Sequence, residues 1–130
     1  MSFSKIRKFT RVALETGIRV STPGAGGWAS RSQNVSLGGM FIQAEQTLDP
    51  GIHCTLEMAS PGLPGSPRIR VDGEIVRSRD EGMAVEFTSI DSDSLVHLWD
   101  LIKHCADDPR TIDKEYFRDL FEIEPPDRAL

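Results

Sequence analysis

The sequence predicts a mainly β protein of one domain, a small barrel followed by one or two α-helices. Three observations predict this fold: the 130-residue length is usual for a single domain, short alternating segments recur along most of the chain, and the hydrophobic period changes near residue 95. The 11 glycines and 8 prolines supply the turns that such a barrel needs.

Six segments have the pattern of strands. The first is expected to be bulged near Gly17, and the fourth shows the clearest alternation of apolar and polar residues. Glycine and proline clusters separate the segments and predict turns between them. The predicted strands cover residues 12–20, 28–35, 40–44, 52–58, 69–76 and 83–87.

Two helices are predicted after the last strand. The first has a stripe with a helical period, with Asp91 or Asp93 as its N-cap. The second begins at Asp108 with Pro109 in its first turn. Their apolar stripes are Leu95, Leu98, Trp99 and Ile102, then Ile112, Tyr116, Phe117, Leu120 and Phe121.

Charge is distributed unevenly along the chain. The net charge of -5 argues against a surface that coats nucleic acid or anionic membrane, yet residues 1–11 hold four basic residues and no acid. Such an arm predicts contact with a phosphate, a nucleic acid or an acidic partner, with a solvated tail as the alternative. We predict a flexible basic arm over 1–11, a barrel with its helix over 12–105, and a second helix and tail over 106–130.

The sequence predicts a cytoplasmic protein without membrane insertion. Cys54 and Cys105 lack the spacing of a disulfide framework or a zinc ribbon. The N-terminus lacks the apolar core of a signal peptide, and no apolar run approaches the roughly 20 residues that span a bilayer.

Catalytic and metal sites are not expected. His97 and His104 lie about two helical turns apart, near 10 Å along the axis, which is too far for one metal without other ligands. We find neither a P-loop nor a nucleophile turn, so we expect no enzyme, no cofactor and no metal.

Two short motifs suggest a ligand site. Arg7 and Arg11 lie four residues apart just before the first strand, and guanidinium groups fork onto phosphate oxygens or the O6 and N7 edge of guanine. This spacing alone is common by chance. The second motif, residues 34–39, contains Asn34, Ser36, Gly38 and Gly39 between two strands.

The second motif has two interpretations. As a simple hairpin, its Asn and Ser bond nearby backbone and its paired glycines supply positive φ. As a ligand site, Asn34 and Ser36 offer hydrogen-bond partners to a base edge, while Gly38 and Gly39 let backbone amides approach the ligand.

Together and in this order, the motifs resemble those of the PilZ family of bacterial cyclic di-GMP receptors. That family has Arg-x-x-x-Arg before the first barrel strand and Asp/Asn-x-Ser-x-x-Gly on the barrel, and every marked position is filled here. Residues 82–87 also resemble the closing strand of PilZ domains. The resemblance implies a six-stranded antiparallel PilZ barrel that binds cyclic di-GMP on its outer face, with Arg7 and Arg11 clasping phosphate and guanine.

Further residues are weaker candidates. Lys5 and Lys8 flank the arginines and add attraction to phosphate, although exposed lysines are usually only solvated. Arg77 lies where some PilZ members have an aromatic residue, and its guanidinium is a candidate for stacking on guanine there, although an ordinary exposed strand arginine is the more common case. Ile6 is apolar where members that bind an intercalated ligand dimer often have Arg, which favours one ligand per site.

The sequence therefore predicts a receptor whose arm closes over cyclic di-GMP and creates a surface that a downstream protein reads. One alternative is a PilZ-fold adaptor that binds proteins without nucleotide. Another, a nucleic-acid binder on an OB-like barrel, is disfavoured by the acidic body and few aromatic residues. A monomer and a weak dimer both remain open, as do the affinity, the partner and the process controlled.

Overall fold

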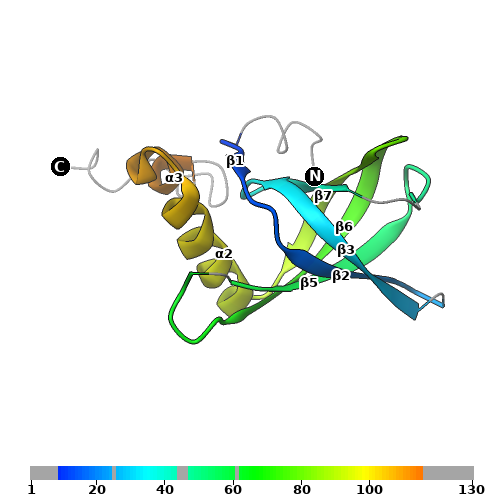
Figure 1. The fold of residues 1–130 in the computed structure, drawn as a ribbon, viewed down its shortest axis with the longest axis horizontal. Coiled ribbons are helices and arrows are strands. Elements are labelled where there is room, and N and C mark those ends of the chain that lie inside the picture. Colours follow the sequence, from blue (N-terminus) through cyan, green and yellow to red (C-terminus); the bar gives the residue numbers. More distant parts are fainter. Residues whose placement is uncertain (1–8, 25, 44–46, 61, 116–130) are drawn as a thin grey trace.

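Six strands close into an antiparallel barrel, which confirms the predicted fold class (Figure 1). The computed structural model describes residues 9–24, 26–43, 47–60 and 62–115. Around the barrel the strand order is β2-β3-β4-β7-β6-β5, and a short extra strand, β1, pairs with β3. The strands are β1 Val12–Ala13, β2 Gly17–Thr22, β3 Gly26–Val35, β4 Gly39–Gln43, β5 His53–Ala59, β6 Arg68–Arg79 and β7 Gly82–Ile90.

Alternation along the strands builds the core. In β5, Cys54, Leu56 and Met58 are buried, as the sequence pattern predicts, because every second side chain of a strand faces the barrel interior. Ile52 was expected to begin this strand, but it lies before the strand and is 40% exposed. Cys54 and Cys105 are both free thiols.

The first predicted strand is divided in two. We expected one bulged strand over 12–20, but β1 ends at Ala13 and β2 begins at Gly17. Ser32 of β3 forms hydrogen bonds with the residues between β1 and β2. Its hydroxyl oxygen accepts from the Thr16 amide at 3.1 Å, and its O–H group donates to the Leu14 carbonyl. A buried side chain thus replaces ladder bonds that a continuous strand would have made.

Two glycines allow the barrel strands to approach closely. A Cβ atom at Gly82 would lie 2.1 Å from the Ile42 carbonyl oxygen, and one at Gly73 would lie 2.5 Å from a Val85 methyl group. No side chain fits at either distance. Packing between β4 and β7 therefore requires glycine at position 82.

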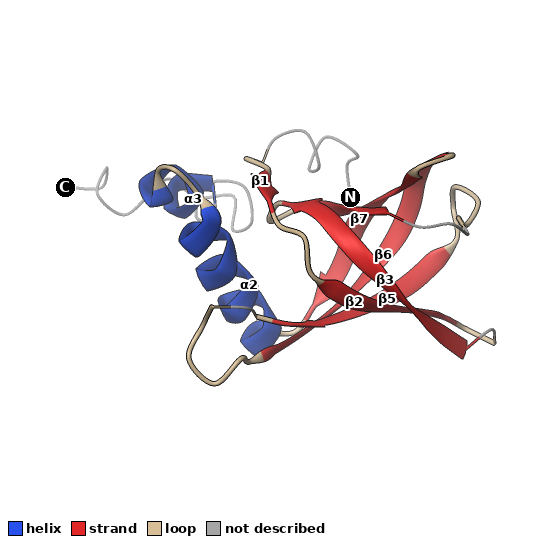
Figure 2. Ribbon diagram, in the orientation of Figure 1, coloured by secondary structure: helices blue, strands red, loops and turns tan. Residues whose placement is uncertain are grey.

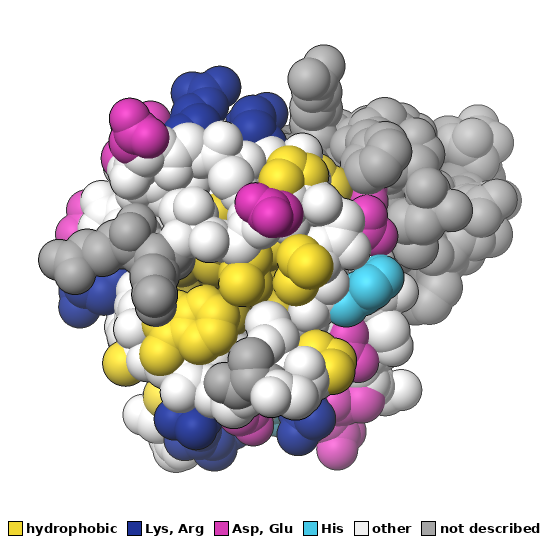
Figure 3. Space-filling model, turned by 90° about the vertical axis from the view of Figure 1, so that its right-hand side faces the viewer, with side chains coloured by type: hydrophobic (Ala, Val, Ile, Leu, Met, Phe, Trp, Pro, Cys, Tyr) yellow, Lys and Arg dark blue, Asp and Glu magenta, His cyan; other side chains and the backbone are white. Residues whose placement is uncertain are grey.

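Helix α2, Ser92–Cys105, packs across one end of the barrel (Figure 2). Of the two predicted caps, Asp91 is the one used, since its carboxylate accepts from the Ser94 amide at 2.8 Å. The helix buries Leu98, Leu101 and Ile102 completely. Figure 3 faces the opposite end of the barrel, where hydrophobic side chains gather near the centre.

Helix α3, Pro109–Glu115, packs beside α2. It begins where predicted, because Asp108 accepts from the Arg110 amide at 3.1 Å, and Ile112 is fully buried. The rest of its predicted stripe, residues 116–121, lies outside the described residues. No helix in the described ranges is long and apolar enough to cross a bilayer.

Candidate functional site

The turn between β3 and β4 is organised by the buried Ser36. Its hydroxyl oxygen accepts from the amides of Gly38 and Gly39 at 3.1 and 3.2 Å. The Ser36 amide donates to the Gly39 carbonyl at 2.8 Å, and the Gly38 carbonyl accepts from Phe87 of β7 at 2.9 Å. These bonds hold the turn against the barrel wall and occupy the amides that were expected to approach a ligand.

The two glycines of this turn do not use the left-handed region. The hairpin interpretation expected positive φ here, and that expectation is wrong. Among the described residues, the glycines with positive φ are Gly24, Gly26, Gly51, Gly62 and Gly65.

A bulge in β3 sets the direction of the Asn34 side chain. Ser32 pairs with Ile42, but Asn34 pairs with Phe41, so Gln33 is an extra residue. Ser32 and Ile42 are fully buried, whereas Asn34 and Phe41 are partly exposed. The bulge therefore places Asn34 on the outer face of the barrel.

Arg11 lies against Asn34 on this outer face. A terminal guanidinium nitrogen of Arg11 donates to the Asn34 side-chain oxygen at 3.2 Å. This contact brings together the second arginine of the first motif and the first residue of the second motif. The pKa of Arg11 lies below its usual value because partial burial removes water and because the Arg77 cation is near.

A second bulge brings Arg77 to the same face. Val71, Gly73 and Ile75 of β6 are buried, and continued alternation would point Arg77 into the barrel. Instead Ile75 pairs with Val85 and Arg77 pairs with Ala84, so one extra residue turns Arg77 outward. Its Nε is buried and has no hydrogen-bond partner among the described residues.

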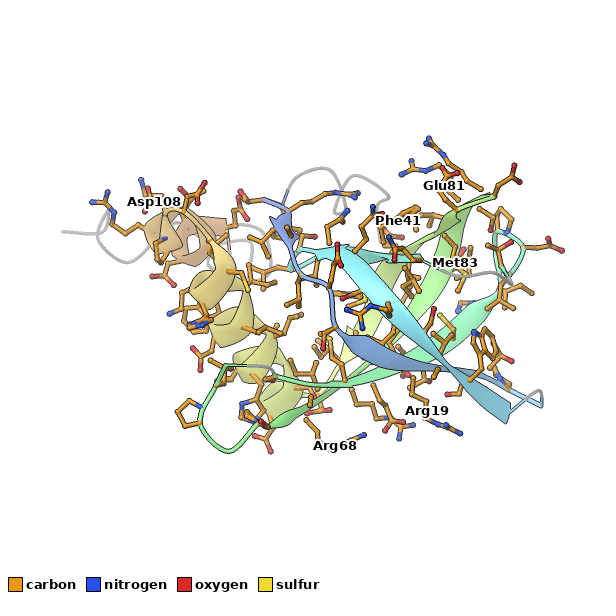
Figure 4. All side chains as sticks on the ribbon, in the orientation of Figure 1. Arg19, Phe41, Arg68, Glu81, Met83 and Asp108 are labelled. Carbon is orange, nitrogen blue, oxygen red and sulfur yellow. The ribbon has the colours of Figure 1, made fainter. Side chains whose placement is uncertain are left out.

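The strand pairings place these groups in one row. Arg77 lies opposite Ala84, Ala84 opposite Phe41, and Phe41 opposite Asn34. Residues directly opposite on antiparallel strands share a face. Figure 4 shows Phe41 on the upper side of the barrel in that view, with Arg19 and Arg68 on the lower side.

The outer face carries two cations, Arg77 at one end of the row and Arg11 beside Asn34 at the other. Within the described part of the chain, neither Arg11 nor Arg77 forms an ion pair, although three other basic residues do. Two partly desolvated cations lie near each other, and the Asn34 amide oxygen and the Phe41 ring lie between them. Such a surface favours an anionic ligand that also has hydrogen-bonding edges. This outer face, with Arg11, Asn34, Phe41 and Arg77, is the candidate site.

Comparison with protein-family models finds a match over most of the chain. The model for the PilZ domain matches residues 5–104, well over half of the chain. The chain belongs to the PilZ domain family. PilZ domains are regulatory receptor domains. A search of the curated proteins finds no match.

Solved structures with this PilZ fold include proteins of low identity. The inhibitor of motility MotI/DgrA of Bacillus subtilis is 18% identical, with a TM-score of 0.63 over 75% of this chain and 50% of that one. The PilZ domain of YcgR from Escherichia coli, solved with c-di-GMP, is 14% identical, with a TM-score of 0.58 over 90% and 98%. The K. pneumonia MrkH complex with c-di-GMP is 16% identical, with a TM-score of 0.55 over 75% and 53%. This chain thus spans about half of the MotI/DgrA and MrkH chains and nearly all of the YcgR PilZ domain.

Of the two motif arginines, only Arg11 lies within the described residues. Arg7, Lys8, Lys5 and Ile6 lie outside the described residues, so their roles stay predictions. Arg11 is described, and the residues beside it are packed.

The segment 9–12 is held by partners on both sides. Phe9 and Val12 are buried in the core, Arg11 bonds Asn34, and Thr10 bonds Glu115 of α3. The end of the predicted arm is therefore packed on the PilZ barrel from residue 9 onward.

Sequence reasoning did not single out Phe41 or Glu115 in this PilZ domain. Phe41 belongs to an alternating strand, and only strand pairing shows that it lies between Asn34 and Ala84. Glu115 follows the buried Ile112 by three residues on the same helical face, which was the available signal. No group of three His, Cys, Asp or Glu in the described ranges could hold a metal ion.

Proposed function

We propose that this PilZ domain is a bacterial cytoplasmic receptor for cyclic di-GMP and acts on a downstream protein, not as an enzyme. The observation that carries the proposal is the contact between Arg11 and Asn34, beside the Arg77 cation, which forms no ion pair with any described residue. It joins both family motifs on one outer face.

The chemistry of the ligand matches that of the face. Cyclic di-GMP has two phosphodiester charges and two guanines. The guanidinium of Arg11 forks onto phosphate oxygens or onto the O6 and N7 edge of guanine, and the Asn34 oxygen accepts from guanine N–H groups. Arg77 supplies the second cation and a flat group that stacks on a purine.

Ser36, Gly38 and Gly39 act mainly through the shape of the turn in this proposal. The Ser36 hydroxyl is already bonded to both glycine amides, and Ser36 is 1% exposed. Its role is therefore to hold Asn34 at the correct position on β3. Arg7 and Lys8 complete the cationic site from the arm.

Binding in this account orders the part of the arm that carries Arg7 and closes it over the ligand. Ordering a segment costs conformational entropy, which the phosphate and guanine contacts repay. The apolar Ile6 favours one ligand per site. Hydrogen exchange over residues 1–8 tests this step, and equal protection with and without ligand would refute it.

Isothermal titration with cyclic di-GMP tests the function. We expect heat of binding for the wild type and a loss of about tenfold to a hundredfold in affinity for Arg11→Ala, because a hydrogen bond to a charged group contributes about 1.5–3 kcal/mol. Arg77→Ala should weaken binding by about tenfold. The matched control is Arg68→Ala, an exposed arginine at the other end of β6, which should bind within about twofold of the wild type.

An absence of heat for the wild type would refute cyclic di-GMP binding. It would leave the PilZ-fold adaptor that binds protein without nucleotide. Equal losses for Arg77→Ala and Arg68→Ala would instead show that general charge, and not the outer face, attracts the ligand.

A further inference from the structure

A buried carboxylate on α3 bonds the segment that carries the arginine motif. Glu115 is 5% exposed, and its Oε1 accepts from the Thr10 amide at 2.9 Å. Its Oε2 accepts from the Thr10 hydroxyl. Both oxygens of one carboxylate are thus used by a single residue that lies 105 positions earlier in the chain.

Thr10 stands directly before Arg11, inside the Arg7-x-x-x-Arg11 motif. The neighbouring Phe9 is 3% exposed and belongs to the core, while Arg11 bonds Asn34 on the outer face. Glu115 therefore fixes the backbone at the point where the chain passes from the core to the candidate site. Without this contact, Thr10 would have no partner for its amide in the described structure.

The position of Glu115 is itself fixed by packing. Ile112, one turn earlier on α3, is fully buried. Asp113 accepts from the Trp99 ring nitrogen at 2.9 Å and lies 3.4 Å from the Lys103 ammonium group, both on α2. Ile112 anchors the face of α3 that carries Glu115, whereas the partly exposed Asp113 is a separate contact of the helix with α2.

We propose that Glu115 is a positioning residue for the ligand site, which holds Thr10 so that Arg11 stays on Asn34 and couples ligand binding to α3. The inference rests on the proposed function. Coupling is reciprocal, so a ligand that engages Arg11 must in turn strengthen the hold on α3. The helix thereby becomes an element through which ligand occupancy changes the surface offered to a partner.

The size of the effect follows from preorganisation. When only about one tenth of the molecules hold Arg11 on Asn34, the apparent affinity falls about tenfold. We expect Glu115→Ala to weaken cyclic di-GMP binding by about tenfold, because it removes both acceptors of Thr10. Thr10→Val keeps the side-chain shape and the hydrogen bond from the backbone amide to Glu115, and removes only the bond from the hydroxyl. It should weaken binding by about threefold.

Two further variants separate positioning from folding. Glu115→Gln retains an oxygen for the Thr10 amide and should bind within about twofold of the wild type. Asp113→Asn weakens the packing of α3 on α2 through Trp99 and Lys103 but leaves Glu115 intact. Its thermal unfolding midpoint should fall while its affinity also stays within about twofold.

Titration of these five proteins, with thermal unfolding of each, tests the inference. Wild-type affinity in Glu115→Ala and Thr10→Val, or an equal loss in Asp113→Asn, would overturn it. An absence of heat for the wild type itself would refute the proposed function instead. In that case, hydrogen exchange decides the inference: amides 10–13 should exchange about tenfold faster in Glu115→Ala than in Asp113→Asn, and equal rates would overturn it.

Discussion

Replacing Ser36 with alanine should destabilise the protein and weaken ligand binding together. The Ser36 hydroxyl accepts from the Gly38 and Gly39 amides at 3.1 and 3.2 Å, and both glycines are buried. Each amide left without a partner costs about 1–3 kcal/mol. Because water has little access to the turn, the loss of both partners should lower the unfolding free energy of Ser36→Ala by about 2–6 kcal/mol.

Urea unfolding measures this loss. For a small domain the free energy falls by about 1–3 kcal/mol per molar urea, so at a slope of about 2 the midpoint should drop by about 1–3 M. In conditions where the variant stays folded, its affinity for cyclic di-GMP should fall at least about tenfold, because Asn34 loses its support.

The matched control is Ser94→Ala on α2, remote from the candidate site. Its hydroxyl accepts from one backbone amide, that of Arg70, at 3.0 Å. This control should lose about 1–3 kcal/mol and keep its affinity. A Ser36→Ala variant within about 0.5 kcal/mol of the wild type would refute the reasoning about the turn.

Three other predictions test packing, protonation and the site. Gly82→Ala should prevent folding or cost about 3 kcal/mol or more, because its Cβ would lie 2.1 Å from the Ile42 carbonyl oxygen. Gly17→Ala is the control, because open space surrounds that position, and equal stability of the two variants in urea would contradict the packing between β4 and β7. Burial and a neighbouring carboxylate raise the pKa of Cys54 from 9.0 to about 11. At pH 8, iodoacetamide should therefore modify Cys54 about a hundredfold more slowly than in the unfolded chain, and equal rates would refute this. The stability from the neutral thiol should be lost as pH rises from about 9 to about 11, seen as a falling thermal midpoint. Asn34→Asp should tighten cyclic di-GMP binding severalfold, because a carboxylate offers guanine N–H groups a charged acceptor; unchanged or weaker binding by titration would count against that role.

Local patterns predicted the elements well. The alternation in residues 52–58 and the helical stripe from Leu95 to Ile102 depend on periods of two and 3.6, which the chain itself records. Asp91 and Asp108 were predicted at helix starts because a short acidic side chain bonds free amides there. These features need no knowledge of distant residues.

The composition of the site depended on strand pairing. A bulge exists only relative to a partner strand, so the outward turn of Arg77 and Asn34 could not be derived from either strand alone. Similarly, the split of the first strand follows from Ser32, which reaches back to the Leu14 carbonyl.

The contact between Thr10 and Glu115 shows the same limit. It joins residues 105 positions apart, and neither lies in a pattern that names the other. The motifs named Arg11 and Asn34, which the structure brings into contact, whereas Phe41 and the supports of the face became visible only in three dimensions.

The most direct test of cyclic di-GMP recognition is a parallel titration of the wild type with cyclic di-GMP and cyclic di-AMP. Guanine presents two acceptors, O6 and N7, to a guanidinium group, whereas adenine presents one acceptor and an amino donor. A receptor that recognises the guanine edge should bind cyclic di-GMP, with an affinity at least about a hundredfold lower for cyclic di-AMP. Equal binding of both nucleotides, or binding of neither, would contradict this recognition.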